Sequence, residues 1–397
     1  MPQQRLEAQL NFQFLALACT AFLSGANLRV FDSILPSVAS EFTISTATAG
    51  HIVATFTLSY GLFQILYGPL GDRFGRIRVV SIATGILVCG SLGSAFARDL
   101  ETLTLFRFLA GIGAAGIIPV SLAWIGDNTT YQNRQIMLGR FIGFILMGQI
   151  FGPLLGGGLA HWLNWRDMFF VFSAFFFLAM IILISIANHG RQHTIEGKQN
   201  TKTTLRENFS NYGRVLKQRW CRIVLVTVFI EGGLFYGSFA FMGIWLEEKF
   251  SIDYLTIGIL LCGFGLGGVI YTKTIKKLLP LLGEMGFVRV GSLTLAMFYV
   301  SVLLLNHIFI FGIACVIGGF GFYMLHNTLQ TKASEMFVPA RGTAIACFAM
   351  CLFCGQALGT LLFGAIIDAY GFFLAFGTVA AGTWLLGYFF RYQLAKQ

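Results

Sequence analysis

Two ten-residue stretches of this chain are near-copies of each other. GQIFGPLLGG occupies residues 148–157, and GQALGTLLFG occupies residues 355–364, which lie 207 residues later. The same offset brings Arg134 onto Arg341, and neighbouring stretches align at an offset of 208. An offset that stays this constant indicates that the second half is a diverged copy of the first. The chain therefore has to fold into two similar halves.

The composition places both halves in a lipid bilayer. The chain is 56% hydrophobic and 11% charged, whereas soluble domains carry about 25% charged residues. Because a helix satisfies its own backbone hydrogen bonds, we predict an all-α membrane protein with twelve transmembrane helices in two six-helix bundles. The bundles comprise residues 1–187 and 221–397, joined by a cytoplasmic linker at 188–220. Twelve apolar stretches, each about 20 residues or longer, lie near 11–36, 47–68, 78–97, 102–124, 137–160, 167–187, 221–245, 254–273, 286–305, 307–329, 342–367 and 371–391.

The basic residues predict the orientation. With a cytoplasmic N-terminus, all but five of the 27 Lys and Arg residues fall in inside loops, inside helix ends or the termini. This positive-inside bias predicts that both termini are cytoplasmic, in a bacterial inner membrane. The net charge of +10 then reflects this topology and contact with anionic lipid headgroups, rather than nucleic-acid binding.

The linker has the pattern of an amphipathic helix. Its apolar residues recur at helical spacing between basic residues, and Thr204 with Glu207 forms a possible capping box. We expect a helix that lies in the membrane interface, with a solvated linker as the alternative. The apolar positions are Leu205, Phe209, Tyr212 and Leu216.

The loop expected between the second and third helices reads GPLGDRFGRIR and spans residues 68–78. Its glycines permit a tight turn, and its dense charge favours a cytoplasmic loop. Position by position it resembles the G-x-x-x-D-R-x-G-R-x-R/K loop of the major facilitator superfamily, and the resemblance extends over essentially the whole chain. The motif residues are Gly68, Gly71, Asp72, Arg73, Gly75 and Arg76.

The resemblance implies two six-helix bundles around a central cavity, which rock against each other to give alternating access. In the family this loop is a latch between the halves, and its acidic residue stabilises the outward-facing state beside the N-terminal dipole of helix 11. That role falls on Asp72. In the second half we expect the equivalent loop near residues 268–278, with Thr272 at the acidic position, so the second latch is expected to be degenerate.

The repeated stretch carries a second motif. Gly148, Gly152 and Gly156 strip one helix face bare for close backbone approach, and Pro153 bends the helix. Together with Gly157 they resemble the G-x-x-x-G-P-x-x-G-G signature on helix 5 of drug:proton antiporters, which marks exporters in the superfamily. We expect the glycine-rich helix 8 to be the packing partner, with generic helix packing as the alternative. Its glycines are Gly258, Gly263, Gly265, Gly267 and Gly268.

Three charged residues fall inside predicted spans of the first half. Arg29 and Asp32 lie on helix 1, and Arg107 lies in a segment that resembles the family's helix 4 motif. Charges in the membrane cost several kcal/mol and are candidates for function. Asp32 and Arg107 lie at similar depths, so we expect them to pair. The alternative is a buried pair that only orders the first half.

Glu231 is the acidic residue within a span of the second half. It lies about ten residues into the seventh stretch, near the midplane, with no basic residue expected at its depth. Burial disfavours the charged form, so Glu231 is the preferred proton-coupling candidate and Asp32 the second. The alternative is a permanently protonated Glu231. We expect His326, near the inner end of the tenth stretch, to be structural.

Polar and aromatic residues at suitable depths are candidates for lining a substrate cavity, although an aromatic stripe is more often packing. Cys351 and Cys354 form a CxxC pair inside an apolar helix, where packing is a more common role than metal binding, so no metal or cofactor is expected. The cavity candidates are Asn27, Tyr60, Gln64, Gln149, Tyr236, Tyr323, Asn327 and Gln356.

These features predict a secondary active transporter, a monomer that exports a small amphipathic compound in exchange for protons by alternating access. A drug-like compound, a siderophore or a metabolite would suit the cavity. A proton-coupled uptake symporter is the nearest alternative, and a membrane sensor without transport activity is a further one. Short loops and the absence of a paired nucleophile and base argue against an enzyme. No nucleotide-binding motif is present, so an ion gradient is expected to drive transport.

Overall fold

A computed structural model describes residues 2–129, 131–189, 205–304 and 306–397. The first half folds into seven helices, and a short linker helix leads into the second half. In chain order the elements are α1 (Pro2–Arg29), α2 (Phe31–Phe42), α3 (Thr46–Phe74), α4 (Arg76–Ala95), α5 (Leu100–Asn128), α6 (Tyr131–Trp162), α7 (Trp165–His189), α8 (Leu205–Lys217), α9 (Arg219–Glu231), the π-helix η1 (Gly232–Gly237), α10 (Met242–Phe250), α11 (Tyr254–Leu304), α12 (Ile308–Glu335), the 3-10 helix η2 (Val338–Ala340) and α13 (Arg341–Leu394).

The helices account for twelve membrane crossings. Within the described residues, nine helical segments are long and apolar enough to span a membrane, and α1 with α2, bent by 47°, makes a tenth. Two of the nine are double length: α11 breaks at Gly283 (φ 63°) and α13 breaks at Gly371 (φ 79°). Each break is a turn between antiparallel helices, which adds two more crossings. The predicted all-helical, two-half membrane fold is thereby confirmed.

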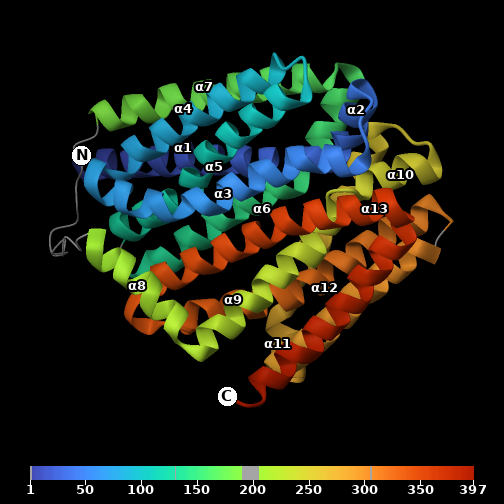
Figure 1. Ribbon diagram of the computed structural model, residues 1–397. Helices are drawn as coiled ribbons and strands as arrows, with labels where there is room; N and C mark the ends of the chain where they lie inside the picture. Colours follow the sequence, from blue (N-terminus) through green and yellow to red (C-terminus); the bar gives the residue numbers. More distant parts are fainter. Residues whose placement is uncertain (1, 130, 190–204, 305) are drawn as a thin grey trace.

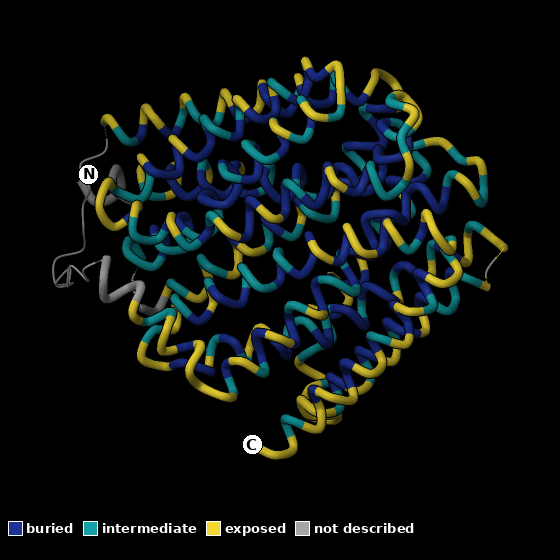
Figure 2. Tube along the Cα trace, in the orientation of Figure 1, coloured by how far each residue is buried: buried dark blue, intermediate teal, exposed yellow. Residues whose placement is uncertain are grey.

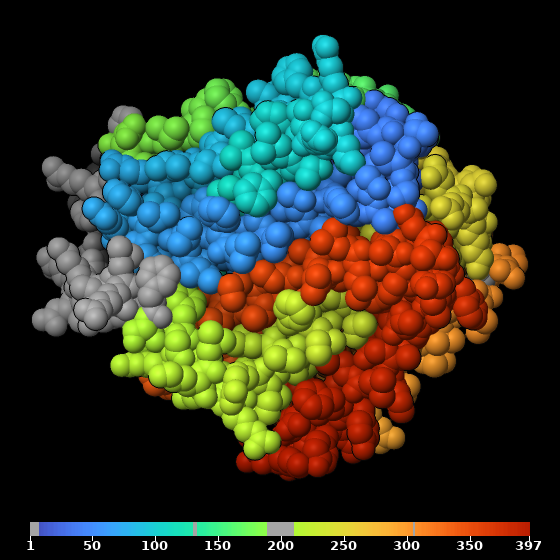
Figure 3. Space-filling view, viewed as in Figure 1, coloured from blue at the N-terminus to red at the C-terminus, as the bar shows by residue number. Residues whose placement is uncertain are grey.

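Figures 1 and 3 show the first half above the second, with α1–α7 in blue to green and α9–α13 in yellow-green to red. Buried residues lie along the inner faces of the helices, and exposed residues follow the outside (Figure 2). Many exposed side chains are apolar: Phe309, Phe373 and Leu105 are 82%, 72% and 63% exposed. A soluble protein rarely presents such a surface, whereas lipid tails accommodate it.

The bundle has two ends, the termini end and the far end. The termini end holds the turns at Gly75 and Gly283 and the start of α13; the far end holds the turns after α2 and α10 and the break at Gly371. α8 lies at the termini end (Figure 1), and its Val215 is fully buried while Leu216 is 53% exposed. The predicted cap at Thr204 lies outside the described residues.

The backbone repeats with the sequence. Thr43 and Ser251, 208 residues apart, close α2 and α10, and both have φ 52°; they are the only non-glycine residues with positive φ in the described chain. Gly75 and Gly283, also 208 apart, form equivalent turns. The prediction that Thr272 replaces Asp72 in a second loop is therefore wrong. Residue 272 lies within α11, and Pro280 occupies the position equivalent to Asp72.

The repeated glycines pack in the same way in both halves. Gly148 and Gly152 abut the backbone carbonyls of Phe22 and Ala26 on α1. Their copies, Gly355 and Gly359, abut Phe229 and Gly233, which lie 207 residues after those same positions. A Cβ on Gly152 would lie 2.7 Å from the Ala26 oxygen. The close packing follows from the missing side chains.

The predicted partner of this stripe needs correction. The stripe faces α1, including Gly156 against Val30, instead of the glycine-rich start of α11. That segment meets a neighbouring face of α6, where Gly258 approaches the Pro153 carbonyl and Gly265 approaches Ile150. Gly157 also contacts this segment, because it abuts the backbone of Tyr254. Gly258 has no side chain, which lets the two halves touch at the Pro153 carbonyl.

Candidate functional site

A small cavity lies between the halves, where the break between α1 and α2 faces η1, α11 and α12. Charged, polar and aromatic side chains share its wall. The volume open to the centre of a water molecule is about 20 Å³, enough for about one water. The lining residues are Arg29, Asp32, Gln149, Ile150, Pro153, Tyr236, Phe239, Leu261, Phe264, Gly265 and Tyr323.

Five residues predicted from sequence thus meet at one place: Arg29, Asp32, Gln149, Tyr236 and Tyr323. The other cavity candidates lie elsewhere in the bundle, held by local contacts. Tyr60 hydrogen-bonds to Gln64, and the centroid of its ring lies 4.4 Å from that of Phe353. Asn27 contacts Arg107, and Asn327 hydrogen-bonds to Tyr271. The backbone carbonyl of Gln356 accepts a hydrogen bond from Thr360.

Arg29 and Asp32 form an ion pair across the bend between α1 and α2. The Arg29 Nη1 lies 3.3 Å from the Asp32 Oδ2, and both side chains are buried. The Arg29 guanidinium also stacks over two rings of the second half, with its Cζ 4.2 Å from the centroid of Tyr236 and 5.6 Å from that of Phe239. A cation over a ring is attracted to its negative face. Arg29 therefore bridges the two halves at the cavity.

The expected pair of Asp32 with Arg107 is not formed. Arg107 is 1% exposed, and its Nη1 lies 3.5 Å from the Asn27 Oδ1. Its Cζ lies 4.0 Å from the ring centroid of Phe56 and 4.7 Å from that of Phe31. The physical reason is proximity along the chain, because Arg29 is three residues from Asp32 and reaches its carboxylate. The charge of Arg107 is stabilised by the faces of aromatic rings instead.

Glu231 has a basic partner, contrary to prediction. The Glu231 Oε2 lies 2.9 Å from the Nδ1 of His326, and Glu231 is 1% exposed. The sequence placed His326 near a helix end, but α12 continues to Glu335, so the imidazole lies ~14 Å inside it. His326 also stacks on Phe322, with ring centroids 5.1 Å apart. The Glu231 Oε1 has no hydrogen-bond partner in the described structure.

Glu231 directly precedes η1, a single stretch of π-helix. The π-helix is rare and is frequently found at functional sites. Here it carries Tyr236, the residue that stacks on Arg29. A change at Glu231 would therefore act on the backbone that positions Tyr236 against the other half.

The loop motif lies at the termini end and is braced within its own half. Asp72 pairs with Arg76 at 2.5 Å, and the Arg76 Nε lies 3.3 Å from the Asp127 Oδ2 on α5. Gly75, with φ 90°, makes the turn. The first turn of α13 begins at Ala340 without a side-chain cap. Asp72 does not engage that helix end in this conformation.

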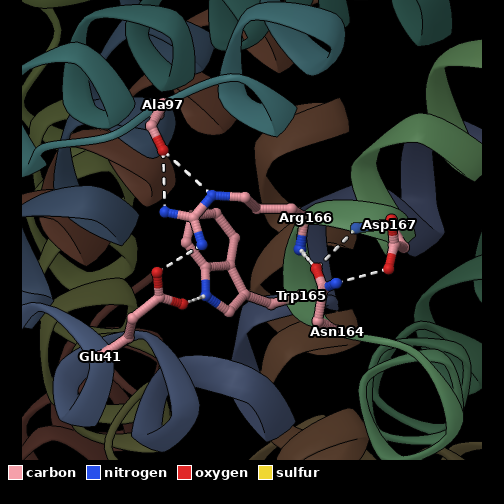
Figure 4. Close-up of polar contacts among 6 residues, drawn as sticks. All are labelled: Glu41, Ala97, Asn164, Trp165, Arg166 and Asp167. Atoms are coloured by element: carbon pink, nitrogen blue, oxygen red, sulfur yellow. Dashed lines mark hydrogen bonds and ion pairs between the residues drawn. The ribbon is translucent and has the colours of Figure 1, made fainter.

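A polar cluster that sequence analysis missed braces the far end of the first half (Figure 4). Glu41 accepts bonds from the Trp165 indole, at 2.5 Å, and from the Arg166 guanidinium. Arg166 also donates to the Ala97 carbonyl at 2.9 and 3.1 Å. An acid at the end of a span and a Trp-Arg pair at the start of another were the available signals. The cluster fixes α2, the α4–α5 loop and α7 together.

The cysteines give no evidence of a metal centre. All eight are free thiols, and no group of three or more His, Cys, Asp or Glu side chains suited to a metal ion occurs within the described residues.

The comparisons with known proteins agree with this architecture. A sequence model of the Major Facilitator Superfamily matches residues 17–340. Multidrug resistance protein 1 of Bacillus subtilis (strain 168) is 25% identical over 379 residues, covering 94% of this chain and 95% of the relative.

Among solved structures, the nucleoside transporter NupG is similar with a TM-score of 0.78 and 12% identity, covering 96% of this chain and 98% of that one. A D-xylose-proton symporter matches with a TM-score of 0.75 and 14% identity, covering 96% and 97%. Because the family model matches most of the chain and the helical fold agrees with it, the chain belongs to the major facilitator superfamily and is a multi-pass membrane transporter of small molecules, not an enzyme.

Proposed function

We propose that this protein is a proton-coupled exporter of small amphipathic compounds in a bacterial inner membrane, with both termini in the cytoplasm. The observation that carries the proposal is the composition of the cavity: four aromatic side chains of the second half line it together with one buried carboxylate–guanidinium pair of the first half. Such a wall favours a ligand with an apolar ring and one charged group. The export direction is supported by the antiporter signature at Gly148–Gly157 and by the relative named for multidrug resistance.

Two elements have separate roles in this proposal. The cavity pair, Arg29 with Asp32, faces the substrate. The buried pair, Glu231 with His326, exchanges the proton, because the pair holds one proton as an imidazolium with a carboxylate and releases it to solution to become a neutral imidazole with a carboxylate. Their link is η1, which connects Glu231 to Tyr236. Each half moves as one unit, and the protein works as a monomer.

The structure corresponds to the inward-facing state in this proposal. At the far end, backbone contacts join the halves at Gly157 with Tyr254 and at Gly364 with Ala47. At the termini end, Asp72 is paired within its own half. A latch that stabilises the outward-facing state would be released in this conformation.

Purified protein in proteoliposomes tests the function. Vesicles loaded with the pH indicator pyranine receive ethidium, a lipophilic cation, or an aromatic carboxylate of similar size. We expect proton movement that depends on one of these compounds and runs opposite to it. Proton movement in the same direction as the compound would replace export by uptake, and transport without proton movement would remove the coupling.

Uptake is the second candidate, and one observation favours it. Among the described residues that line the cavity, Asp32 is the acid that neutralises Arg29. Protonation of Asp32 would leave Arg29 free to bind an anion, so a proton and an anion would enter together. The aromatic carboxylate in the same vesicles distinguishes this symport from export.

A further inference from the structure

At the far end, a carboxylate of the second half caps a helix of the first. The Asp368 Oδ1 accepts a hydrogen bond from the backbone N–H of Ala47 at 3.1 Å. Ala47 is the second residue of α3, and Asp368 lies three residues before the break in α13 at Gly371. The contact therefore joins α3 and α13, helices from opposite halves, where both reach the far end.

The first turn of α3 is short of acceptors without this contact. Helix N-termini leave backbone N–H groups unpaired and carry a partial positive charge. The cap residue, Ser45, accepts the N–H of Thr48 at 3.3 Å. Asp368 takes the N–H of Ala47, so it supplies both a hydrogen bond and a negative charge to the helix end. Below it, a Cβ on Gly364 would lie 2.8 Å from the Ala47 Cα, which brings the two backbones into contact.

The other side of the far end repeats this arrangement. Gly157, the counterpart of Gly364 at an offset of 207, abuts the backbone of Tyr254 at the start of α11. His161, the counterpart of Asp368, places its Nδ1 3.5 Å from the Oδ1 of Asp253, the residue before α11. In each case the end of a glycine-rich helix covers the first turn of a helix in the opposite half.

We propose that Asp368 is a latch that holds the far end closed by capping α3, and that outward opening requires its release. The pair of His161 with Asp253 is its weaker counterpart across the pseudo-twofold axis. Like the loop latch of the family, this latch places an acid at the N-terminus of a helix in the other half. It differs because it acts at the far end and stabilises the inward-facing conformation instead of the outward-facing one. The inference rests on alternating access and is independent of substrate or direction.

Distances between spin labels test this proposal. Labels replace Phe96 and Phe309, which are 65% and 82% exposed and lie at the far end of opposite halves, in a background without other reactive cysteines. Asp368→Ala removes the acceptor and the charge, and Asp368→Asn removes the charge alone. We expect Asp368→Ala to raise the fraction of molecules with a longer far-end distance about two- to fivefold, with Asp368→Asn between it and the parent.

Asp99→Ala is the matched control. Asp99 caps α5 by accepting the N–H of Thr102 at 2.8 Å, but both residues belong to the first half. We expect no change in the far-end distance from this variant. An unchanged distribution in a monodisperse Asp368→Ala sample, or the same shift in Asp99→Ala, would overturn the proposal. The distances are measured without substrate or gradient, so failure of the export assay would not produce either result.

Discussion

The two halves share their packing but differ in their charges. Gly148 and Gly355 fit against equivalent carbonyls, and Thr43 and Ser251 end equivalent helices with the same φ. The buried charges are not repeated. The position of Arg107 is Cys315 in the second half, and Glu231 with His326 has no counterpart in the first. Close backbone contact constrains the residues of both halves equally, whereas a charged residue within the membrane is retained only where it has a function.

The turns at the termini end show the same divergence. In the first half Arg76, just after Gly75, reaches Asp127 at 3.3 Å. In the second half Glu284, just after Gly283, reaches Lys332 at 2.8 Å. An ion pair is kept between the equivalent helices but not between equivalent residues, since the counterpart of Asp127 is Glu335, which itself contacts Lys332 at 3.3 Å. The pair therefore serves as a brace. The acidic residue of the latch, Asp72, has become Pro280, so only the first half can present that carboxylate.

The largest expected difference between the halves concerns their buried pairs. Asp32→Asn leaves the permanently charged Arg29 without its carboxylate, and we expect a loss of about 3–5 kcal/mol in the free energy of unfolding. Glu231→Gln leaves His326, which can become neutral, so the loss should stay below about 2 kcal/mol. Denaturation of the purified variants in detergent measures both. Equal losses in the free energy of unfolding would mean that the Arg29–Asp32 and Glu231–His326 pairs carry the same charges.

The shared packing predicts a smaller effect that is the same in both halves. Gly152→Leu drives a side chain into the Ala26 backbone, and we expect a cost of about 1–3 kcal/mol, with loss of transport. Gly359→Leu should behave alike. Gly143→Leu is the control on the same helix, because nothing lies within 4 Å of its Cβ position. Thermal unfolding compares the three, and a harmless Gly152→Leu would contradict the packing.

The loop motif should matter in one half only. Asp72→Asn removes the acid that we expect to hold the outward-facing state, so the population should shift further to the inward-facing state and transport should fall severalfold. Glu284→Gln, which breaks only the brace to Lys332, should leave the population unchanged. Spin labels at Ile136 and Val338, at the termini end, report the shift. A matching shift in both variants would show that the brace sets the equilibrium.

The smallest effect concerns helix caps at the far end. Hydrogen bonds from Thr102 lower the pKa of Asp99, the cap of α5. Its counterpart, His307, caps α12 without a side-chain bond. His307→Asp should therefore stabilise the second half by about 0.5–1 kcal/mol. Because a cap that lowers the pKa of Asp is lost on protonation, the gain should be present at neutral pH, decline as the pH falls below about 4 and be absent well below that pH. Melting at both pH values tests this.

The repeat and the apolar stretches predicted a helical membrane protein of two similar halves, and the resemblance of residues 68–78 to the major facilitator superfamily implied two six-helix bundles around a cavity. Depth in the spans included Gln149, Tyr236 and Tyr323 among the cavity candidates, but it did not separate them from those that lie elsewhere: Asn27, Tyr60, Gln64, Asn327 and Gln356. Pairings were harder to predict. Which of two arginines reaches Asp32 depends on the bend between α1 and α2, and the apolar pattern does not encode that bend.

The partner of Glu231 was missed for a similar reason. Hydropathy ended the tenth stretch near residue 329, but α12 runs to Glu335 because Lys332 is neutralised by Glu284 and Glu335. That extension moves His326 inward by more than a turn. The error in a helix boundary thus hid the hydrogen-bonded pair of Glu231 with His326. For the second loop, the offset of 208 that links Gly75 to Gly283 is the sequence signal that locates the turn.

The central claim is that the second half carries the proton and the first half faces the substrate. Proteoliposomes loaded with pyranine, with ethidium or the aromatic carboxylate outside, test it through Glu231→Gln. The account predicts that this variant loses proton movement and gradient-driven transport but retains exchange of labelled for unlabelled compound, whereas Asp32→Asn impairs both. Compound-dependent proton movement that persists at wild-type strength in Glu231→Gln would contradict the account and would move the proton to Asp32.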